Sequence, residues 1–272
     1  MKYVKLSSGY DIPQLGLGTW QLTGKKCVEA VREALVMGYT HVDTAVYYGN
    51  HRKVGKGITE SGVEREKLFI TTKLPKKKLR RSQVIETGKK MLNELAIDYI
   101  DLLLIHWPNK KVPFAETLEA MKVLVDRGLV KSIGISNFNA TIAAEASEVS
   151  PLPIVINQVE FHPLLFQKEL LDACVLLGMR VTAYSPLAQG KVMQNGLLAQ
   201  IAEKYDSTAA QISLAWLLEK GIIVIPKAGS IDHLKNNLDA VALNLQPDDL
   251  AAIDAIEEEQ RFIDGSWKDY DF

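Results

Sequence analysis

The chain has 272 residues, a length that a single α/β barrel can fill as one domain. With 47% hydrophobic and 24% charged residues, its composition is typical of a globular protein with a large core. A formal net charge of -1, from 32 basic and 33 acidic residues, argues against a nucleic-acid-binding protein, which normally has a basic excess.

Residues 1–5 lack the apolar stretch of a secretory signal, and no apolar run is long enough to cross a bilayer. The two cysteines, Cys27 and Cys174, lie far apart in helix-like segments. They could in principle form a bridge, but in a chain without an export signal we expect two reduced thiols. The sequence therefore predicts a cytoplasmic protein without a membrane or nucleic-acid partner.

Residues 1–12 are predicted to form a small hairpin that caps the bottom of the fold. From residue 14 onward, short apolar runs rich in β-branched residues alternate with amphipathic helical patterns. The strand candidates are 14–17, 40–43, 68–72, 101–105, 132–135, 154–159, 180–183 and 222–225. Strict alternation favours a parallel sheet, and eight βα units in one chain predict closure into a (β/α)8 TIM barrel.

The helical patterns have recognisable ends. In 27–37 and 113–127 the apolar residues recur at helical spacing, and a glycine follows each segment. Segments 195–205 and 247–258 predict extra helices beyond the eight of a simple barrel. We expect one domain over residues 1–272, since no linker or low-complexity stretch interrupts it.

An irregular tail is predicted over residues 260–272. Exposed aromatic side chains in a tail need a surface to lie on, so they either pad the barrel or roof a substrate pocket at its rim. These aromatic residues are Phe262, Trp267, Tyr270 and Phe272.

Titratable side chains stand where three consecutive predicted strands end, and in a TIM barrel the strands' carboxyl ends form the active-site mouth. Asp43 ends the second strand, with Tyr48 in the loop after it, Lys73 ends the third and His106 ends the fourth. Each has a plain alternative: a helix N-cap, a packing aromatic, a surface lysine and a core histidine, in that order. Their predicted convergence on one mouth favours a site.

These four groups suit the reduction of a carbonyl. Hydride addition to the carbon develops negative charge on the oxygen, which then needs a proton. We expect Lys73 to lower the pKa of Tyr48 so that the hydroxyl can act as the acid, while Asp43 keeps the lysine charged. His106 can donate a hydrogen bond that orients the carbonyl oxygen.

Other chemistries fit the sequence less well. The five histidines show no metal-site spacing, so no metal is expected. The G-x-G-x-x-G fingerprint is absent, so a dinucleotide would bind without a Rossmann unit. A barrel lyase with Lys73 as a Schiff base remains an alternative, although it leaves Tyr48 idle.

A series of short motifs resembles the aldo-keto reductases in order and spacing, from Gly16 to about Asn237. The motifs read DTAVYYGN at 43–50, KL at 73–74, IHWP at 105–108, GISNF at 134–138, NQVE at 157–160, AYSPL at 183–187 and IPK at 225–227. Within that family, the chain looks similar to short bacterial enzymes of the 2,5-diketo-D-gluconate reductase type.

The resemblance implies an NAD(P)H-dependent reductase of aldehydes, diketones and keto-sugars, acting as a monomer with Tyr48 as general acid. It also implies a nicotinamide site at Ser136, Asn137, Gln158 and Tyr184. The pyrophosphate loop would comprise Ser185, Leu187, Gln189 and Gly190. The adenosine end would meet Lys227, Ser230, His233 and Asn237, and the substrate pocket would be walled by Trp20, Tyr47 and Trp107. The short polar turn at 134–137 also has a plain interpretation as a helix N-cap.

The sequence departs from the family pattern where the cofactor's adenosine end is expected. Ala228 replaces a usual serine, His233 replaces the arginine that clamps the 2′-phosphate, and Asn236 replaces a glutamate. Histidine is mostly neutral at pH 7 and holds phosphate less well than arginine. We therefore expect NADP(H) to be preferred and NAD(H) to be tolerated. A further departure is His51, which stands where a glutamate is usual.

Two points stay open from sequence alone. The basic run 76–81 is either a solvated loop or a device that draws anionic substrates to the mouth. Relatives of this fold also serve as channel subunits or lens proteins. The intact set of four argues against such a non-enzymatic role.

Overall fold

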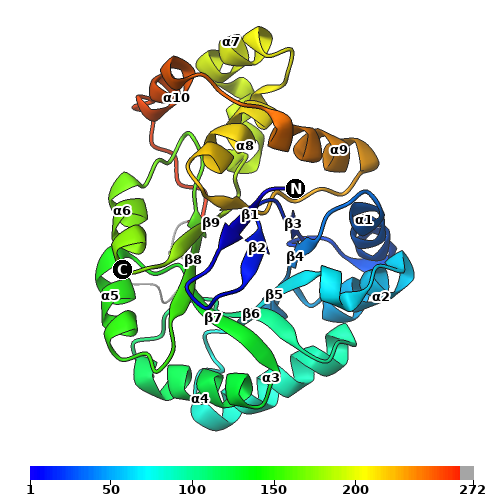
Figure 1. The fold of residues 1–272 in the computed structure, drawn as a ribbon, viewed down its shortest axis with the longest axis vertical. Helices are drawn as coiled ribbons and strands as arrows, with labels where there is room; N and C mark the ends of the chain where they lie inside the picture. Colours follow the sequence, from blue (N-terminus) through cyan, green and yellow to red (C-terminus); the bar gives the residue numbers. More distant parts are fainter. Residues whose placement is uncertain (264–272) are drawn as a thin grey trace.

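The structure is a computed structural model that describes residues 1–263. Eight parallel strands lie in the order β10-β9-β8-β7-β6-β5-β4-β3, and Figure 1 shows them around a central axis with helices outside. The predicted (β/α)8 TIM barrel is thus confirmed. The strands are β3 (Leu17–Gly18), β4 (His41–Asp43), β5 (Phe69–Leu74), β6 (Ile100–Ile105), β7 (Val130–Ser136), β8 (Ile154–Glu160), β9 (Arg180–Tyr184) and β10 (Ile223–Val224).

The barrel closes between β3 and β10 through isolated bridges. Leu15 pairs with Val224, and Gly18 pairs with Lys227. A side chain at Gly18 would collide with the backbone carbonyl of Ile225, so glycine lets the two strands approach. Because this ladder is so sparse, β3 and β10 are shorter than the runs predicted from sequence.

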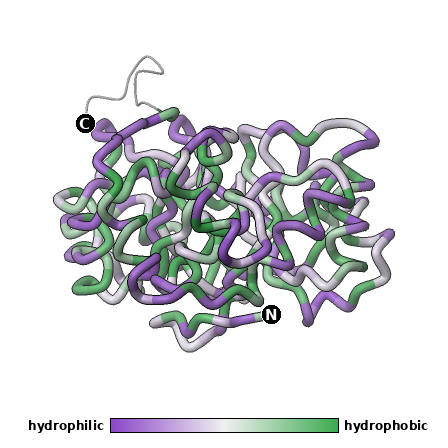
Figure 2. Tube along the Cα trace, turned by 90° about the horizontal axis from the view of Figure 1, so that it is seen from above, coloured by the Kyte–Doolittle hydropathy of each residue, from purple (hydrophilic) through white to green (hydrophobic). Residues whose placement is uncertain are grey.

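The predicted N-terminal hairpin is present. Strands β1 (Tyr3–Lys5) and β2 (Asp11–Pro13) pair antiparallel and lie across one end of the barrel (Figure 1). Leu6 and Ile12 are buried in one apolar cluster with barrel residues such as Leu104. The hairpin therefore seals the amino-terminal end of the strands, and Figure 2 shows the N-terminus along the lower edge of the molecule.

The helices follow the strands as expected, with two additions. Helix α7 precedes α8 in the connection after β9, and α10 follows the last barrel helix; both were predicted as extra helices. The helices are α1 (Gly24–Val36), α2 (His51–Ser61), α3 (Arg81–Leu95), α4 (Phe114–Asp126), α5 (Ala140–Glu148), α6 (Lys168–Leu176), α7 (Gly196–Lys204), α8 (Ala209–Glu219), α9 (Ile231–Asp239) and α10 (Pro247–Asp254).

Short 3₁₀ turns complete the described chain. They are η1 (Val46–Tyr48), η2 (Arg65–Lys67), η3 (Ala188–Gln194) and η4 (Ala240–Ala242). The turn η1 lies between β4 and α2, and η2 lies between α2 and β5. Tyr48 is the last residue of η1, in the loop at the carboxyl end of β4.

The larger apolar core lies between the strands and the helices. Cys27 and Cys174 are both buried there as free thiols, and burial raises the pKa of Cys27 to about 11, as expected for inert packing cysteines. In residues 1–263 no helix is both long and apolar enough to span a membrane.

Candidate active site

The strand pleat places the predicted catalytic side chains inside the barrel. Successive side chains alternate between the two faces of a strand. On β6 the inward positions are Leu102, Leu104 and then His106 just past the strand end, and on β5 Lys73 follows two inward residues in the same way. The apolar layers below thus end in a polar layer at the carboxyl ends of the strands.

Lys73 is the hub of this polar layer. Its side chain is 1% exposed, and its ammonium donates to Asp43 Oδ1 at 2.5 Å, to the Thr44 carbonyl at 3.0 Å and to the Tyr48 hydroxyl at 3.4 Å. Asp43 uses its second oxygen to accept from Gln158 Nε2 at 2.8 Å. Three of the four predicted residues are therefore joined directly by hydrogen bonds.

Burial acts on both charges of the central pair. It lowers the pKa of Lys73 and raises the pKa of Asp43, while their mutual attraction opposes each shift. At a separation of 2.5 Å, with further hydrogen bonds to both groups, we infer that the pair persists in the ionised form.

Tyr48 does not behave as the sequence suggested. We expected Lys73 to lower its pKa, but burial raises the pKa of Tyr48 well above its usual range, and the Asp43 carboxylate raises it further. The expectation was wrong because burial of the hydroxyl dominates its pKa and the negative charge of Asp43 acts in the same direction. The hydroxyl keeps its proton until a stronger base, such as a developing alkoxide, lies against it.

His106 completes the group by ring contacts. Its ring centroid lies 5.9 Å from that of Tyr48 and 5.5 Å from that of Tyr47. Burial and the charge of Lys73 lower the pKa of His106 well below its usual range, so the imidazole is neutral. Its Nδ1 atom is buried without a hydrogen-bond partner in the described chain.

The predicted nicotinamide residues form one hydrogen-bonded network beside this group. Ser136 Oγ donates to the Gln158 carbonyl at 2.8 Å, and Asn137 Nδ2 donates to the His106 carbonyl at 2.9 Å. The Tyr184 hydroxyl donates to Asn137 Oδ1 at 2.8 Å, while the Tyr184 ring stays half-buried. Asn137 holds a left-handed backbone with φ of 63°, a conformation that asparagine tolerates better than most residues.

The predicted pyrophosphate loop follows β9. Ser185, Gln189 and Gly190 all have positive φ, so the backbone turns sharply there. Ala188 N donates to the Ser185 carbonyl at 2.8 Å, and Gly190 N donates to the Leu187 carbonyl at 2.7 Å. The four predicted loop residues thus lie in two successive turns after β9.

The residues predicted for the adenosine end differ in how exposed they are. Lys227 and His233 are exposed, and Ser230 caps α9 by accepting from His233 N at 3.3 Å. Asn237 is buried beside the Tyr39 hydroxyl rather than exposed. Ala228 is buried as well.

The predicted substrate-pocket residues lie around the mouth. Trp20 is 36% exposed and Tyr47 is 51% exposed, while Trp107 is half-buried. Burial raises the pKa of Tyr47, and hydrogen bonds with the backbone of Lys77 and Lys76 oppose that rise. The prediction about the tail aromatics falls mostly outside the described residues, because Trp267, Tyr270 and Phe272 lie beyond residue 263.

Sequence reasoning did not identify the role of Glu160, which ends β8. Its carboxylate accepts from Phe262 N at 2.8 Å and from Ile263 N at 2.9 Å, and His162 Nε2 lies 3.2 Å away. The Phe262 ring lies 5.6 Å from that of His162. Glu160 therefore holds the beginning of the tail at the rim. The only sequence signal for this residue was its place in the NQVE motif.

The departure at His51 also acquires a structural explanation. Its Nε2 lies 2.9 Å from Thr72 Oγ1, and its Nδ1 lies 3.4 Å from Glu94 Oε2. Glu94 of α3 thus supplies a carboxylate next to the buried histidine, behind the strand that carries Lys73.

Comparison with known proteins identifies the family. Residues 14–258 match the Aldo/keto reductase family. The glyoxal reductase of Bacillus subtilis (strain 168) is 39% identical over 259 residues, which cover 95% of this chain and 94% of that protein. The chain therefore belongs to the aldo-keto reductase family, as its motifs indicated.

Solved structures agree with this assignment. A crystal structure provisionally named 2,5-diketo-D-gluconic acid reductase B is 37% identical, with a TM-score of 0.92 over 96% of this chain and 93% of that one. A Bombyx mori aldo-keto reductase in complex with NADP is 36% identical, with a TM-score of 0.92 over 99% and 97% of the two chains.

The geometry also bears on the alternative chemistries. A Schiff-base lysine must present a free amine, whereas Lys73 directs its ammonium to three acceptors, including Asp43 at 2.5 Å. This arrangement disfavours the lyase. Among residues 1–263, no group of three or more His, Cys, Asp or Glu side chains is placed to hold a metal ion.

Proposed function

We propose that the protein reduces the carbonyl of aldehydes, diketones or keto-sugars to an alcohol, with NADPH as its preferred reductant. The reduced nicotinamide, when bound, supplies a hydride to the carbonyl carbon. The carbonyl π bond breaks, its electron pair moves to oxygen, and a proton from the protein completes the alcohol.

In this proposal Tyr48 donates the proton. The pKa of Tyr48 is raised, but an alkoxide is a stronger base than a phenolate, so transfer is favourable once negative charge develops on the oxygen. The Lys73 ammonium, 3.4 Å from the hydroxyl, then stabilises the phenolate until water returns the proton. Neutral His106 donates a hydrogen bond to the same oxygen and orients it.

The residues at the ends of β7, β8 and β9 fit a nicotinamide. A carboxamide needs both donors and acceptors, which Ser136, Asn137 and Gln158 provide, and Tyr184 offers a half-buried ring face for stacking. The turn at 185–190 would hold the pyrophosphate. Lys227, Ser230, His233 and Asn237 would meet the adenosine end, and Trp20, Tyr47 and Trp107 would wall the substrate pocket.

One observation carries this proposal: a buried ammonium that donates to both Asp43 and the Tyr48 hydroxyl at the mouth of the barrel. The test is NADPH oxidation by the purified protein against a panel of aldehydes, diketones, glyoxals and keto-sugars, with the alcohol product identified. We expect turnover of at least one class. Absence of reduction across the panel, with a folded protein that binds NADPH, would contradict the proposal.

Cofactor choice is a separate part of the proposal. His233 is exposed and bears no permanent charge, so we expect NADPH to be preferred with measurable NADH turnover. Restoring an arginine with His233→Arg should lower KM for NADPH by about tenfold, because a charge-assisted phosphate contact is worth about 1.5–3 kcal/mol. KM for NADH should stay the same. A wild type that cannot use NADH at all would contradict the tolerance.

We further propose that the chain acts in the cytoplasm as a monomer with a single domain over residues 1–272. The described barrel is continuous from β3 to α10, with the hairpin packed on its end. Light scattering of the purified protein at working concentration tests the monomeric state, and a mass of two chains would contradict it.

A further inference from the structure

The loops that follow the eight strands have a charge pattern that differs from that of the whole chain. All of these loops lie within the described residues and contain no Asp or Glu, although the chain as a whole has 33 acidic residues. Eight basic residues stand in them: Lys76, Lys77, Lys78, Arg80, Lys110, Lys111, Lys191 and Lys227. The charged side chains of these loops are therefore all cationic, while the acidic residues 257–259 precede Gln260, whose N–H donates to the Leu164 carbonyl in the loop after β8.

Six of these cations belong to two neighbouring loops, 75–80 after β5 and 106–113 after β6, which we call the basic rim. The two loops are joined, because Asn109 Nδ2 donates to the Lys76 carbonyl at 3.0 Å and Arg80 donates to the Lys111 carbonyl at 3.3 Å. Glu116, just beyond the second loop, pairs with Arg80 at 2.8 Å.

Four of the remaining cations of the rim have no ion-pair partner among the described residues. Lys77, Lys78, Lys110 and Lys111 are exposed, and none of them forms an ion pair with another residue of 1–263. Like charges held together on an exposed surface repel one another. An anionic ligand at this rim would relieve that repulsion.

The rim adjoins the reacting groups. The Tyr47 ring lies 5.5 Å from the ring of His106, which is the first residue of the second rim loop. The rim follows β5 and β6, whereas the residues proposed to hold the cofactor's pyrophosphate and adenosine end follow β9 and β10. Its charge is thus placed to act on the substrate rather than on the cofactor's phosphates.

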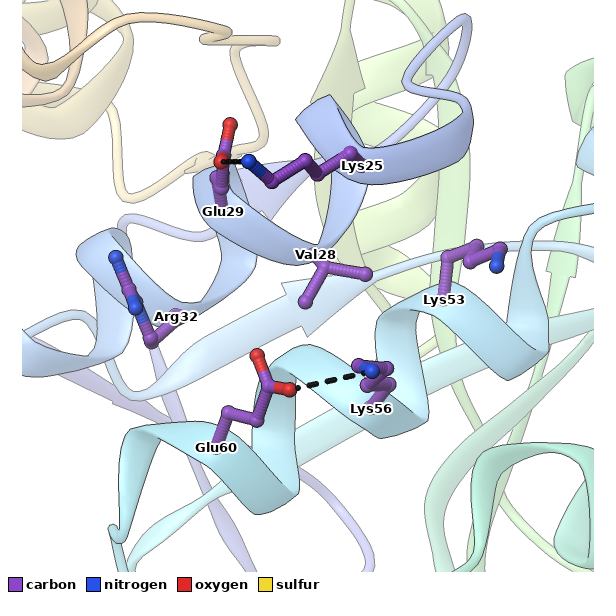
Figure 3. Close-up of a pocket in the computed structure, with 7 residues that line it drawn as sticks. All are labelled: Lys25, Val28, Glu29, Arg32, Lys53, Lys56 and Glu60. Carbon is purple, nitrogen blue, oxygen red and sulfur yellow. Dashed lines mark ion pairs between the residues drawn. The ribbon is translucent and has the colours of Figure 1, made fainter.

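A second group of cations on the same molecule gives a useful contrast. Between α1 and α2 lies a surface groove of about 360 Å³ lined by Lys25, Val28, Glu29, Arg32, Lys53, Lys56 and Glu60 (Figure 3). There Lys25 pairs with Glu29 at 3.3 Å and Lys56 pairs with Glu60 at 3.4 Å. Carboxylates are interleaved with cations in this groove, whereas the basic rim has almost none.

From these observations we infer that the physiological substrate is a small carbonyl compound that carries an anionic group, a carboxylate or a phosphate. This inference rests on the proposed function and names the substrate class of the same site. The rim attracts the anion and orients the molecule with its carbonyl toward Tyr48 and His106. Focused charge of this kind raises association rates by about 10- to 1000-fold at low salt.

The experiment compares three para-substituted benzaldehydes at saturating NADPH. Para-formylbenzoate and para-formylphenyl phosphate carry the two kinds of anion, and methyl para-formylbenzoate is the neutral analogue. The test variants are Lys77→Gln/Lys78→Gln, Lys110→Gln/Lys111→Gln and their combination. The control variant, Lys53→Gln/Lys56→Gln, removes two cations from the groove of Figure 3.

We expect kcat/KM for an anionic aldehyde to fall about threefold in each rim double variant and about tenfold in the combination, mostly through KM. The neutral ester should change less than twofold, and the control variant should behave as wild type. Raising ionic strength from about 10 mM to about 300 mM should reproduce the tenfold loss for the anion alone, since screening shortens the Debye length from about 30 Å to below 10 Å. The anionic aldehyde whose kcat/KM falls more in the rim variants shows whether the natural anionic group is a carboxylate or a phosphate.

Two failures can be told apart. If the ester is reduced as well as both anions, and neither salt nor the rim variants discriminate between them, the inference is wrong while the proposed function stands. If none of the three aldehydes is reduced, and no compound of the wider panel is either, the proposed function itself fails.

Discussion

The two ends of the barrel are built for different tasks. At the amino-terminal end of the strands, Leu6 and Ile12 of the hairpin close an apolar cluster with Phe69, Leu102 and other inward residues. At the carboxyl end, the next inward layer is polar and buried, and the loops above it are cationic. The same strands supply both layers, two residues apart.

The apolar end of the barrel stabilises the fold, whereas the polar end carries the candidate active site. An apolar layer stabilises the fold simply by leaving water, at about 25 cal/mol per Å² of surface. A buried Asp43–Lys73 pair does not stabilise in that way, because desolvation of two charges offsets most of their attraction. The structure therefore predicts that changes at the two ends separate activity from stability.

The largest combined effect on activity and stability is expected at Lys73. Lys73→Met should reduce kcat by about 10³-fold, since it removes the cation beside Tyr48, the proposed proton donor. It should also destabilise the fold by about 3–5 kcal/mol, because Asp43 is left as an uncompensated buried charge. Kinetics together with urea unfolding measure both quantities.

The double variant Asp43→Asn/Lys73→Met is the matched control. It removes both charges, so the free energy of unfolding should recover to within about 1 kcal/mol of wild type. Activity should stay lost. Recovery of activity along with stability would show that the pair serves the fold alone.

The opposite outcome is expected below the polar layer. Leu104 is fully buried inside the barrel, one inward position before His106. Leu104→Ala should lower the free energy of unfolding by about 2–5 kcal/mol through the lost apolar contacts and the cavity left behind. The kcat of the folded protein should change little. A loss of kcat comparable to that of Lys73→Met would erase the distinction between the two ends.

A smaller effect concerns His41, which is buried on the first residue of β4 with its Nε2 at 3.0 Å from Thr71 Oγ1. Burial lowers the pKa of His41 from 6.5 to about 3, so the folded protein holds it neutral. The unfolded chain binds a proton that the folded chain does not, so this contribution is full above pH 6.5 and is lost as pH falls toward 3.

His41→Gln isolates that contribution. Between about pH 7 and pH 5, the wild type should lose about 2 kcal/mol more stability than the variant. For each protein, denaturant unfolding at the two pH values gives the change in the free energy of unfolding. The changes of the wild type and the variant are then compared. Equal losses would mean that His41 titrates normally in the folded state.

Much of the fold could be predicted from sequence because its physics is local. Buried parallel strands read as short apolar runs, and helices as stripes of apolar residues that end in glycine, so the barrel order and even α7 and α10 were predicted. The edges of β3 and β10 could not be, since they depend on how the first and last strands meet around Gly18.

The convergence of the four candidate side chains could be predicted from sequence, but their pKa values could not. Strand-end position picked out Asp43, Lys73 and His106, because every strand of a barrel ends at the same mouth. The raised pKa of Tyr48 escaped prediction, since it depends on how completely the hydroxyl is buried and on the nearby charge of Asp43. The hydrogen bonds from Phe262 N and Ile263 N to Glu160 also escaped prediction, because they join positions about a hundred residues apart.

The central claim is that Tyr48 gives the proton at the polar end of the barrel. The most direct measurement is the single-turnover rate of carbonyl reduction by Tyr48→Phe, with Tyr47→Phe as the neighbouring control. Phenylalanine retains the packing and loses the proton, so Tyr48→Phe should be slower by about 10²–10⁴-fold with unchanged stability, while Tyr47→Phe stays within about tenfold of wild type. An undiminished rate in Tyr48→Phe would contradict the mechanism.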